Sequence, residues 1–400
     1  LACPTRALSQ RHISDTMLYL YLIFLGLFFL VMWVIMKAGT AAAKSSQYME
    51  NITRAIDGDL DLESQRPPQE GAHDRLIRRQ THKTMDECDQ ALSSNPRSPE
   101  GLVDRAMIHL SHKSYDEAIA DCNAALRQEP AGYARASYCR ALAYMEKNDN
   151  DQAILDVSDA IKGNPHDPDY LVTRALLFYR AMEHQLALSD CDAALEIEPE
   201  HQKALTVRSL VNSALGETQS ALMDAQRALH GGAPNALILT ARAAAFYGLR
   251  ENALALRDCN LAIDWSPDLV DAYLVRAMVR MTLGETEKAA EDVQEALGLA
   301  PQHLLTQCTS AWLYATSPDD SIRDGSKALT LAKRVCEGRD ERMPNLLDTL
   351  AAAYAEVGDY EKAVSVQTRA LSHPDYPSTL IEEARMRLKK YRNSEPWREG

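Results

Sequence analysis

The stretch AIADCNAAL at residues 118–126 decides the fold of this 400-residue chain, because it returns along the sequence at an almost constant interval. A close variant, ALSDCDAAL, occupies residues 187–195. The second alanine of the stretch recurs at spacings of 34 or 35 residues, at Ala91, Ala125, Ala160, Ala194, Ala228, Ala262 and Ala296. Such a period predicts a stack of similar units, each packed on its neighbours, rather than one compact core.

Two further features keep the same register. A small residue lies seven positions earlier, at Ala118, Ala153, Ala187, Ala221, Ala255 and Ala289. A proline follows five positions later in most units, at Pro96, Pro130, Pro165, Pro199, Pro267 and Pro301. Small residues let two antiparallel helices approach closely, and proline ends a helix because it cannot continue the hydrogen-bond ladder. Each unit is therefore predicted to be a pair of helices.

The pattern resembles the tetratricopeptide repeat, a 34-residue helix pair with small residues at positions 8, 20 and 27 and proline at position 32. The resemblance covers residues 81–374 and implies an all-α, right-handed superhelical solenoid of antiparallel helix pairs. After a partial repeat, six regular repeats are expected to begin near Pro99, Ala134, Pro168, Gln202, Ala236 and Val270. A seventh repeat is enlarged, with extra residues expected around 316–325, and an eighth begins near Pro344. Residues 375–400 are expected to form a capping helix and a tail.

An uncharged segment precedes the repeats, from Thr16 to Met36. A helix of this length reaches roughly 30 Å, the thickness of the hydrocarbon layer of a membrane. We therefore expect a transmembrane helix at residues 17–37, with residues 1–16 as its flank and residues 38–80 as a polar tether. A cleaved signal peptide is the alternative, because Ala41–Ala43 offer a small-residue cleavage pattern. The flanking charges do not decide which side of the membrane carries the repeats.

The net charge and the absence of catalytic motifs argue against several classes of function. The chain carries a formal net charge of -14, which repels phosphate backbones, so nucleic acid is not an expected partner. No nucleophile elbow, phosphate-binding loop, zinc-protease motif or dinucleotide fingerprint occurs. We expect no catalytic residue, cofactor, metal site or small-molecule substrate. An enzyme would require a separate pocket that holds a perturbed cysteine or histidine.

Charged residues also follow the period. Position 7 holds arginine and position 23 holds aspartate in all six regular repeats, a variant similar to the repeats of heat-shock organising co-chaperones. Arginine is costly to bury without a partner, so we predict pairs that link helices within or between repeats; solvated side chains are the alternative. The residues are Arg105, Arg140, Arg174, Arg208, Arg242 and Arg276, with Asp121, Asp156, Asp190, Asp224, Asp258 and Asp292. The cysteines that recur at position 24 are expected to be buried free thiols: Cys88, Cys122, Cys191 and Cys259.

The resemblance further implies a concave, ligand-facing surface, formed by positions 2, 5, 6, 9, 12 and 13 of each first helix. These positions predict an apolar, peptide-binding groove of Val103, Met107, Leu110, Tyr138, Leu142, Met145, Val172, Leu176, Tyr179, Leu210, Tyr247, Leu274, Met278 and Met281. Such a wall suits an apolar segment of a partner protein. The alternative is that neighbouring repeats bury these side chains. The carboxylate clamp of the co-chaperones is missing, because position 5, where it needs lysine, holds residues such as Val103 and Thr206.

Together these features predict a membrane-tethered scaffold or adaptor that binds a protein or peptide segment in its concave groove. The alternative is a constitutive structural subunit of a larger membrane-associated assembly.

Overall fold

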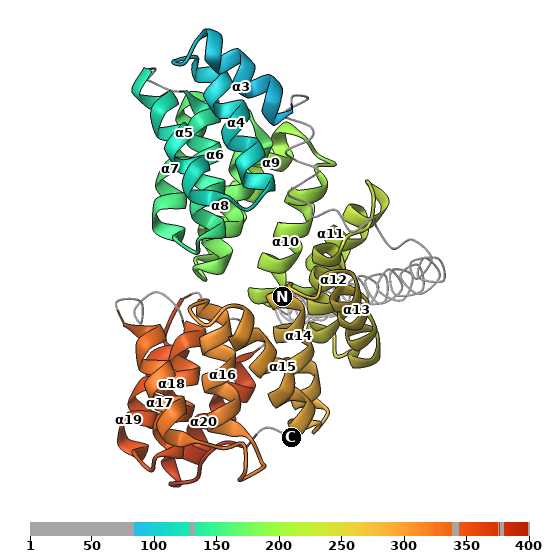
Figure 1. Cartoon of the computed structure of the whole chain (residues 1–400). Helices are drawn as coiled ribbons and strands as arrows, with labels where there is room; N and C mark the ends of the chain where they lie inside the picture. Colours follow the sequence, from blue (N-terminus) through green and yellow to red (C-terminus); the bar gives the residue numbers. More distant parts are fainter. Residues whose placement is uncertain (1–83, 129–132, 338–343, 375, 377–379, 399–400) are drawn as a thin grey trace, which may run out of the picture. The chain divides into compact units, whose positions relative to one another are not determined.

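The structure is a computed structural model that describes residues 84–128, 133–337, 344–374, 376 and 380–398. In these ranges the chain forms 18 α-helices and no strand (Figure 1). None of these helices is long and apolar enough to cross a membrane. The expected transmembrane helix at residues 17–37, its flank and the tether up to residue 80 lie outside the described residues.

Sixteen of the helices alternate as first and second helices of eight repeats. The first helices are α4 (Pro99–Ser111), α6 (Ala134–Glu146), α8 (Pro168–Arg180), α10 (Gln202–Ala214), α12 (Ala236–Gly248), α14 (Val270–Thr282), α16 (Leu304–Thr316) and α18 (Pro344–Glu356). The second helices are α5 (Tyr115–Gln128), α7 (Asn150–Gly163), α9 (His184–Ile197), α11 (Thr218–His230), α13 (Asn252–Trp265), α15 (Thr286–Leu299), α17 (Gly325–Cys336) and α19 (Tyr360–Leu371). The helix α3 (Met85–Ser94) precedes them and α20 (Ile381–Arg392) follows them.

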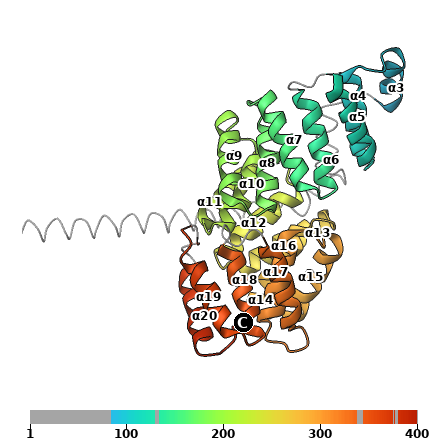
Figure 2. The same ribbon diagram turned by 90° about the vertical axis from the view of Figure 1, so that its left-hand side faces the viewer.

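The first helices of the six regular repeats and of the eighth begin at the residues where the sequence pattern places the repeats. Each first helix packs against its own second helix, and most also pack against the first helix of the next repeat, as α8, α10, α12 and α14 do in succession (Figure 2). The alanines at positions 8, 20 and 27 lie where helices meet. Ala106, Ala118 and Ala125 of the first repeat, for example, have no exposed surface. Larger side chains at these places would push the helices apart.

The enlarged seventh repeat differs from the others in its connections. Residues 317–324 join α16 to α17, whereas three residues make the same connection in a regular repeat, as in 147–149. Arg323 organises this loop by donating a hydrogen bond to the Ser317 carbonyl at 2.9 Å. Asp324 then caps α17 by accepting from the Lys327 backbone amide at 2.9 Å. The insertion therefore lies partly in the expected loop and partly between α17 and α18.

In seven of the eight repeats, the turn between the two helices contains one residue with a positive φ. It is a glycine in three repeats, including Gly284 with φ of 74°. Lys113, Asn148, Met182 and Arg250 adopt the same conformation. A residue with a Cβ pays roughly 1–2 kcal/mol in this region, because its Cβ approaches the following carbonyl oxygen.

We expect Gly284→Ala to lower the free energy of unfolding by about 1 kcal/mol. No atom lies within 4 Å of the added Cβ, so the loss would come from the backbone conformation alone. Gly298→Ala is the matched control: its Cβ also meets open space, but Gly298 lies inside α15, where alanine should add about 0.5–1 kcal/mol. Urea denaturation followed by circular dichroism measures both. Equal effects would contradict this account of the turn.

Candidate protein-interaction surface

The six arginines at position 7 and the six aspartates at position 23 meet in pairs. In each of these six repeats the arginine donates hydrogen bonds from Nε and Nη2 to the aspartate sixteen residues later, which joins the first helix to the second. The Nε and Nη2 atoms of Arg105, for example, donate to the two carboxylate oxygens of Asp121 at 2.8 Å. The equivalent pairs are Arg140–Asp156, Arg174–Asp190, Arg208–Asp224, Arg242–Asp258 and Arg276–Asp292. All six aspartates are buried.

In five of the six pairs, a third contact of the arginine reaches the preceding repeat. The Nη1 atom of Arg208 donates to Asp192 at 2.8 Å, and that of Arg276 donates to Asn260 at 2.8 Å. The same contact joins Arg105 to Asp89, Arg140 to Asn123, and Arg174 to Ser158. One guanidinium therefore connects two consecutive second helices through the first helix between them. These hydrogen bonds raise the pKa of Arg105 and Arg208, so both side chains stay charged and serve the structure.

Removing one partner of the most buried pair should be costly. Arg242 and Asp258 are 2% and 0% exposed, so Asp258→Ala would leave a buried guanidinium without its carboxylate. We expect a loss of about 3–5 kcal/mol in the free energy of unfolding, and a smaller loss for Arg242→Met combined with Asp258→Leu. Chemical denaturation measures both. Lys162→Ala, which removes an exposed pair with Asp159, should have no measurable effect.

The fourteen side chains of the expected groove do not form an open apolar surface. Ten are buried: Val103, Met107, Leu110, Tyr138, Leu142, Met145, Val172, Leu210, Leu274 and Met281. The other four, Leu176, Tyr179, Tyr247 and Met278, are half-buried. Neighbouring first helices pack directly on one another, so side chains assigned to a ligand fill the contacts between repeats. Tyr138 shows this, because its ring lies 4.5 Å from that of Tyr170 in the next first helix.

Half-buried Tyr179 lies beside a contact that the repeat pattern does not reveal. Met182, in the turn after α8, is 7% exposed and belongs to one apolar cluster with Cys308 of α16 and Leu347 of α18. The third repeat thus touches the seventh and eighth. The one sequence signal is an apolar side chain at the positive-φ position, where the other non-glycine residues are polar. We name this the Met182 contact.

Two histidines lie near this contact and are kept neutral by burial. Burial lowers the pKa of the His184 imidazole to about 4; its ring centre lies 6.0 Å from that of Tyr179. Burial also lowers the pKa of the His303 imidazole. The Asp271 carboxylate acts in the opposite direction and raises this pKa, whereas the Arg180 guanidinium lowers it further. Protonation of either ring would therefore place a charge in a desolvated region.

The free energy of unfolding should fall as the pH falls from about 6.5 to about 4. Between these pH values the unfolded chain binds a proton at His184 and the folded chain does not. The free energy of unfolding is therefore highest above about pH 6.5 and decreases as the pH falls to about 4, with a slope approaching about 1.4 kcal/mol per pH unit. His184→Gln should flatten this dependence, whereas substitution of the exposed His112 should not. Urea denaturation at several pH values measures the difference; parallel curves for wild type and His184→Gln would contradict the assignment.

Residues of α16 and α18 contact charged residues of α20 and of the segments that follow α16 and α20. Arg387 of α20 donates to Asp348 at 2.9 Å and lies over the Trp312 ring, 5.3 Å from its centre. Glu356, the last residue of α18, forms ion pairs with Arg323 at 2.9 Å and with Arg398 at 2.7 Å. In the register of the repeat, Asp348, Trp312 and Glu356 occupy positions 5, 9 and 13. These are positions that the resemblance assigns to ligand binding, so we treat this cluster as the candidate site.

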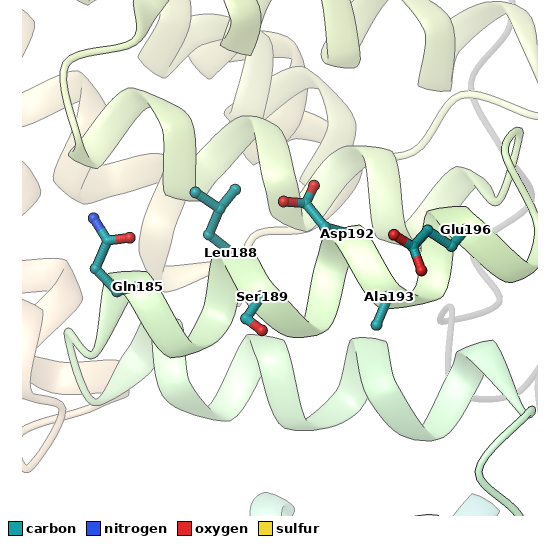
Figure 3. A pocket seen from close by; sticks show the side chains of 6 residues that line it. All are labelled: Gln185, Leu188, Ser189, Asp192, Ala193 and Glu196. Carbon is teal, nitrogen blue, oxygen red and sulfur yellow. The ribbon is translucent and has the colours of Figure 1, made fainter.

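A shallow hollow lies elsewhere, along one face of α9 (Figure 3). Its volume is about 500 Å³, and the side chains shown are Gln185, Leu188, Ser189, Asp192, Ala193 and Glu196. Asp192 is already paired with Arg208. The lining combines one amide, one hydroxyl, two carboxylates and two apolar side chains.

The cysteines at position 24 are buried free thiols. Cys88, Cys122, Cys191 and Cys259 are at most 1% exposed. Burial raises the pKa of Cys191 and Cys259 well above the ordinary value, which keeps both thiols protonated and unreactive.

The architecture defines the class: the described chain is an all-helical solenoid of helix pairs. Comparison with known proteins identifies the repeat. One tetratricopeptide-repeat profile matches residues 88–133 and 138–202, and another matches residues 270–303. The chain therefore contains tetratricopeptide repeats, as its sequence pattern predicts. Proteins with this fold generally mediate protein–protein interactions, and the matches indicate no enzyme family.

Solved structures resemble this chain at low identity. One chain in the structure of the APC/C hetero-tetramer Cut9–Hcn1 is matched over 58% of its length and over 76% of this chain, with 13% identity and a TM-score of 0.50. A tetratricopeptide repeat protein from Parabacteroides merdae ATCC 43184 matches 74% of this chain and 99% of its own, with 19% identity and a TM-score of 0.39. At such identities the similarity concerns the fold alone. No curated protein matches the chain.

Proposed function

We propose that this protein is a membrane-tethered interaction scaffold that binds a segment of a partner protein on its tetratricopeptide repeats. The observation that carries the proposal is the cluster on α16 and α18, where Trp312 and Glu356 stand at ligand-facing positions and contact a chain segment from outside the repeat. The arginines and aspartates of the regular repeats bind each other instead. The acidic Glu356 differs from the lysine-rich clamp of co-chaperones, so we propose a basic rather than an acidic ligand, although the repeats resemble the co-chaperone subtype.

The proposed membrane tether is inferred from the sequence alone. The 21 uncharged residues from Thr16 to Met36 suffice for one helical span, and residues 38–80 are polar and include Pro67 and Pro68. A single span would hold the repeats near a membrane surface while leaving them free to meet a partner.

A constitutive subunit of a membrane-associated assembly is the second candidate. Exposed apolar side chains favour it: Leu155, Leu186 and Met223 are 59%, 50% and 44% exposed and lie on α7, α9 and α11, the second helices of three consecutive repeats. Apolar side chains on successive helices suit a lasting protein interface.

Purification of the full chain in mild detergent distinguishes between these two candidate functions. A scaffold should carry its partner in less than equimolar amount and lose it on dilution, whereas a fixed subunit should keep a companion at a constant ratio. Before detergent is added, the intact chain should stay in the membrane fraction after alkaline carbonate washing. A chain released by carbonate, or one that lacks residues 1–43 by mass spectrometry, would contradict the tether. Purification without any companion would contradict both functions.

A further inference from the structure

The segment after α20 turns back onto the last two repeats. Ser394 has φ of 59° and changes the direction of the chain, and Trp397 and Arg398 then meet residues of α16, α18 and α20. Residues 392–395 are exposed, whereas Trp397 packs against the apolar cluster of the seventh and eighth repeats. The contacts of this segment are therefore concentrated in its last two described residues.

Trp397 is the second tryptophan that lies beside a buried guanidinium. The Arg387 guanidinium lies 5.3 Å from the centre of the Trp312 ring and 5.9 Å from that of the Trp397 ring. The Arg387 side chain is 4% exposed, and its Nη1 and Nη2 atoms donate to Glu383 at 2.6 Å and to Asp348 at 2.9 Å. Its position is thus fixed by carboxylates that belong to the helices. Trp312 and Arg387 form a preorganised platform for an aromatic ring.

Arg398 binds at the carboxyl ends of two first helices. Its Nη1 atom lies 2.7 Å from the carboxylate of Glu356 and donates to the Ala315 carbonyl at 3.5 Å. Arg323 holds the other oxygen of Glu356 at 2.9 Å, which orients the carboxylate. The Glu356 side chain is 13% exposed. Carbonyl groups at helix ends attract a cation, so this place is suited to an arginine.

The register of the repeats shows what this surface is suited to bind. Trp312, Ala315 and Glu356 stand at positions 9, 12 and 13, which the resemblance to the tetratricopeptide repeat assigns to ligand binding. Arg398 contacts Ala315 and Glu356, while Trp397 lies against the same Arg387 guanidinium that Trp312 contacts. The segment therefore occupies the place of a ligand, and its chemistry describes the ligand: a ring for the platform and a guanidinium for Glu356.

We propose that the ends of α16 and α18, with α20, form a binding site for an aromatic–arginine pair, and that Trp397 and Arg398 fill it as an internal ligand. A partner segment with the same pair must displace them, so the free site is available only in competition with the chain itself. This inference rests on the proposed function and names the chemistry of the partner segment.

The test adds the internal ligand in trans. A labelled peptide of residues 393–398, NSEPWR, is titrated by fluorescence anisotropy into the full chain in detergent, as wild type and as the double variant Trp397→Ala with Arg398→Ala. The emptied site should bind the peptide at least tenfold more tightly than wild type does. Adding Glu356→Gln to the double variant should weaken binding at least tenfold, because the carboxylate charge is lost. A peptide with alanine in place of tryptophan should not bind.

Two results would overturn the proposal. Equal affinity of the peptide for wild type and double variant would place its site elsewhere, and absence of saturable binding to a double variant with the wild-type circular dichroism spectrum would remove the site. Should the double variant lose helicity, Arg398→Ala alone replaces it, with the exposed Arg392→Ala as matched control, and the same two results decide. The peptide comes from the chain itself, so its binding is measured whether or not a partner co-purifies. Failure here is thus distinct from failure of the proposed scaffold function.

Discussion

The arginine at position 7 is the constraint on which the regular repeats depend. Its guanidinium is planar and offers donors in a fixed fork, so it can bind an aspartate of its own repeat on one edge while Nη1 reaches the preceding second helix. A lysine, with one ammonium group, could not fix both directions. Because five of the six guanidinium groups are bound on two sides, the orientation of these repeats relative to the preceding one is set by the same geometry. The alanines at positions 8, 20 and 27 then only need to permit close packing.

The features that the sequence predicts correctly are those set by interactions within one repeat or between neighbouring repeats. The first helices begin at Pro99, Ala134 and Pro168 because helix starts, proline stops and small residues act within one repeat or between neighbours, and these patterns recur in the sequence. The paired arginines were predictable for the same reason. The burial of Tyr138 and Leu210 was not, because a position assigned to a ligand in one array can be filled by a neighbouring helix in another. Exposure depends on how closely successive first helices approach, and single positions do not record that distance.

The candidate site lies where the period weakens. The enlarged seventh repeat contributes Arg323 from its long loop, the eighth contributes Asp348 and Glu356, and α20 contributes Arg387. None of these residues belongs to the regular motif, so self-similarity could not identify them. Their common feature is charge of opposite sign at positions that meet only when the last two repeats and α20 are folded together. The binding chemistry of this array is therefore expected at the repeats whose sequence differs from the regular motif.

The Met182 contact changes how such an array should behave as a physical object. In a linear stack each repeat interacts with its neighbours alone, so unfolding can begin at an end and proceed unit by unit. A contact between the third repeat and the seventh and eighth closes a long loop through the intervening repeats. The entropic cost of that closure grows only slowly with loop length, while loosening any unit inside the loop also weakens the closing contact. The repeats inside the loop should therefore unfold cooperatively. Their unfolding requires the Met182 contact to break first, so it cannot simply proceed from one end of the array.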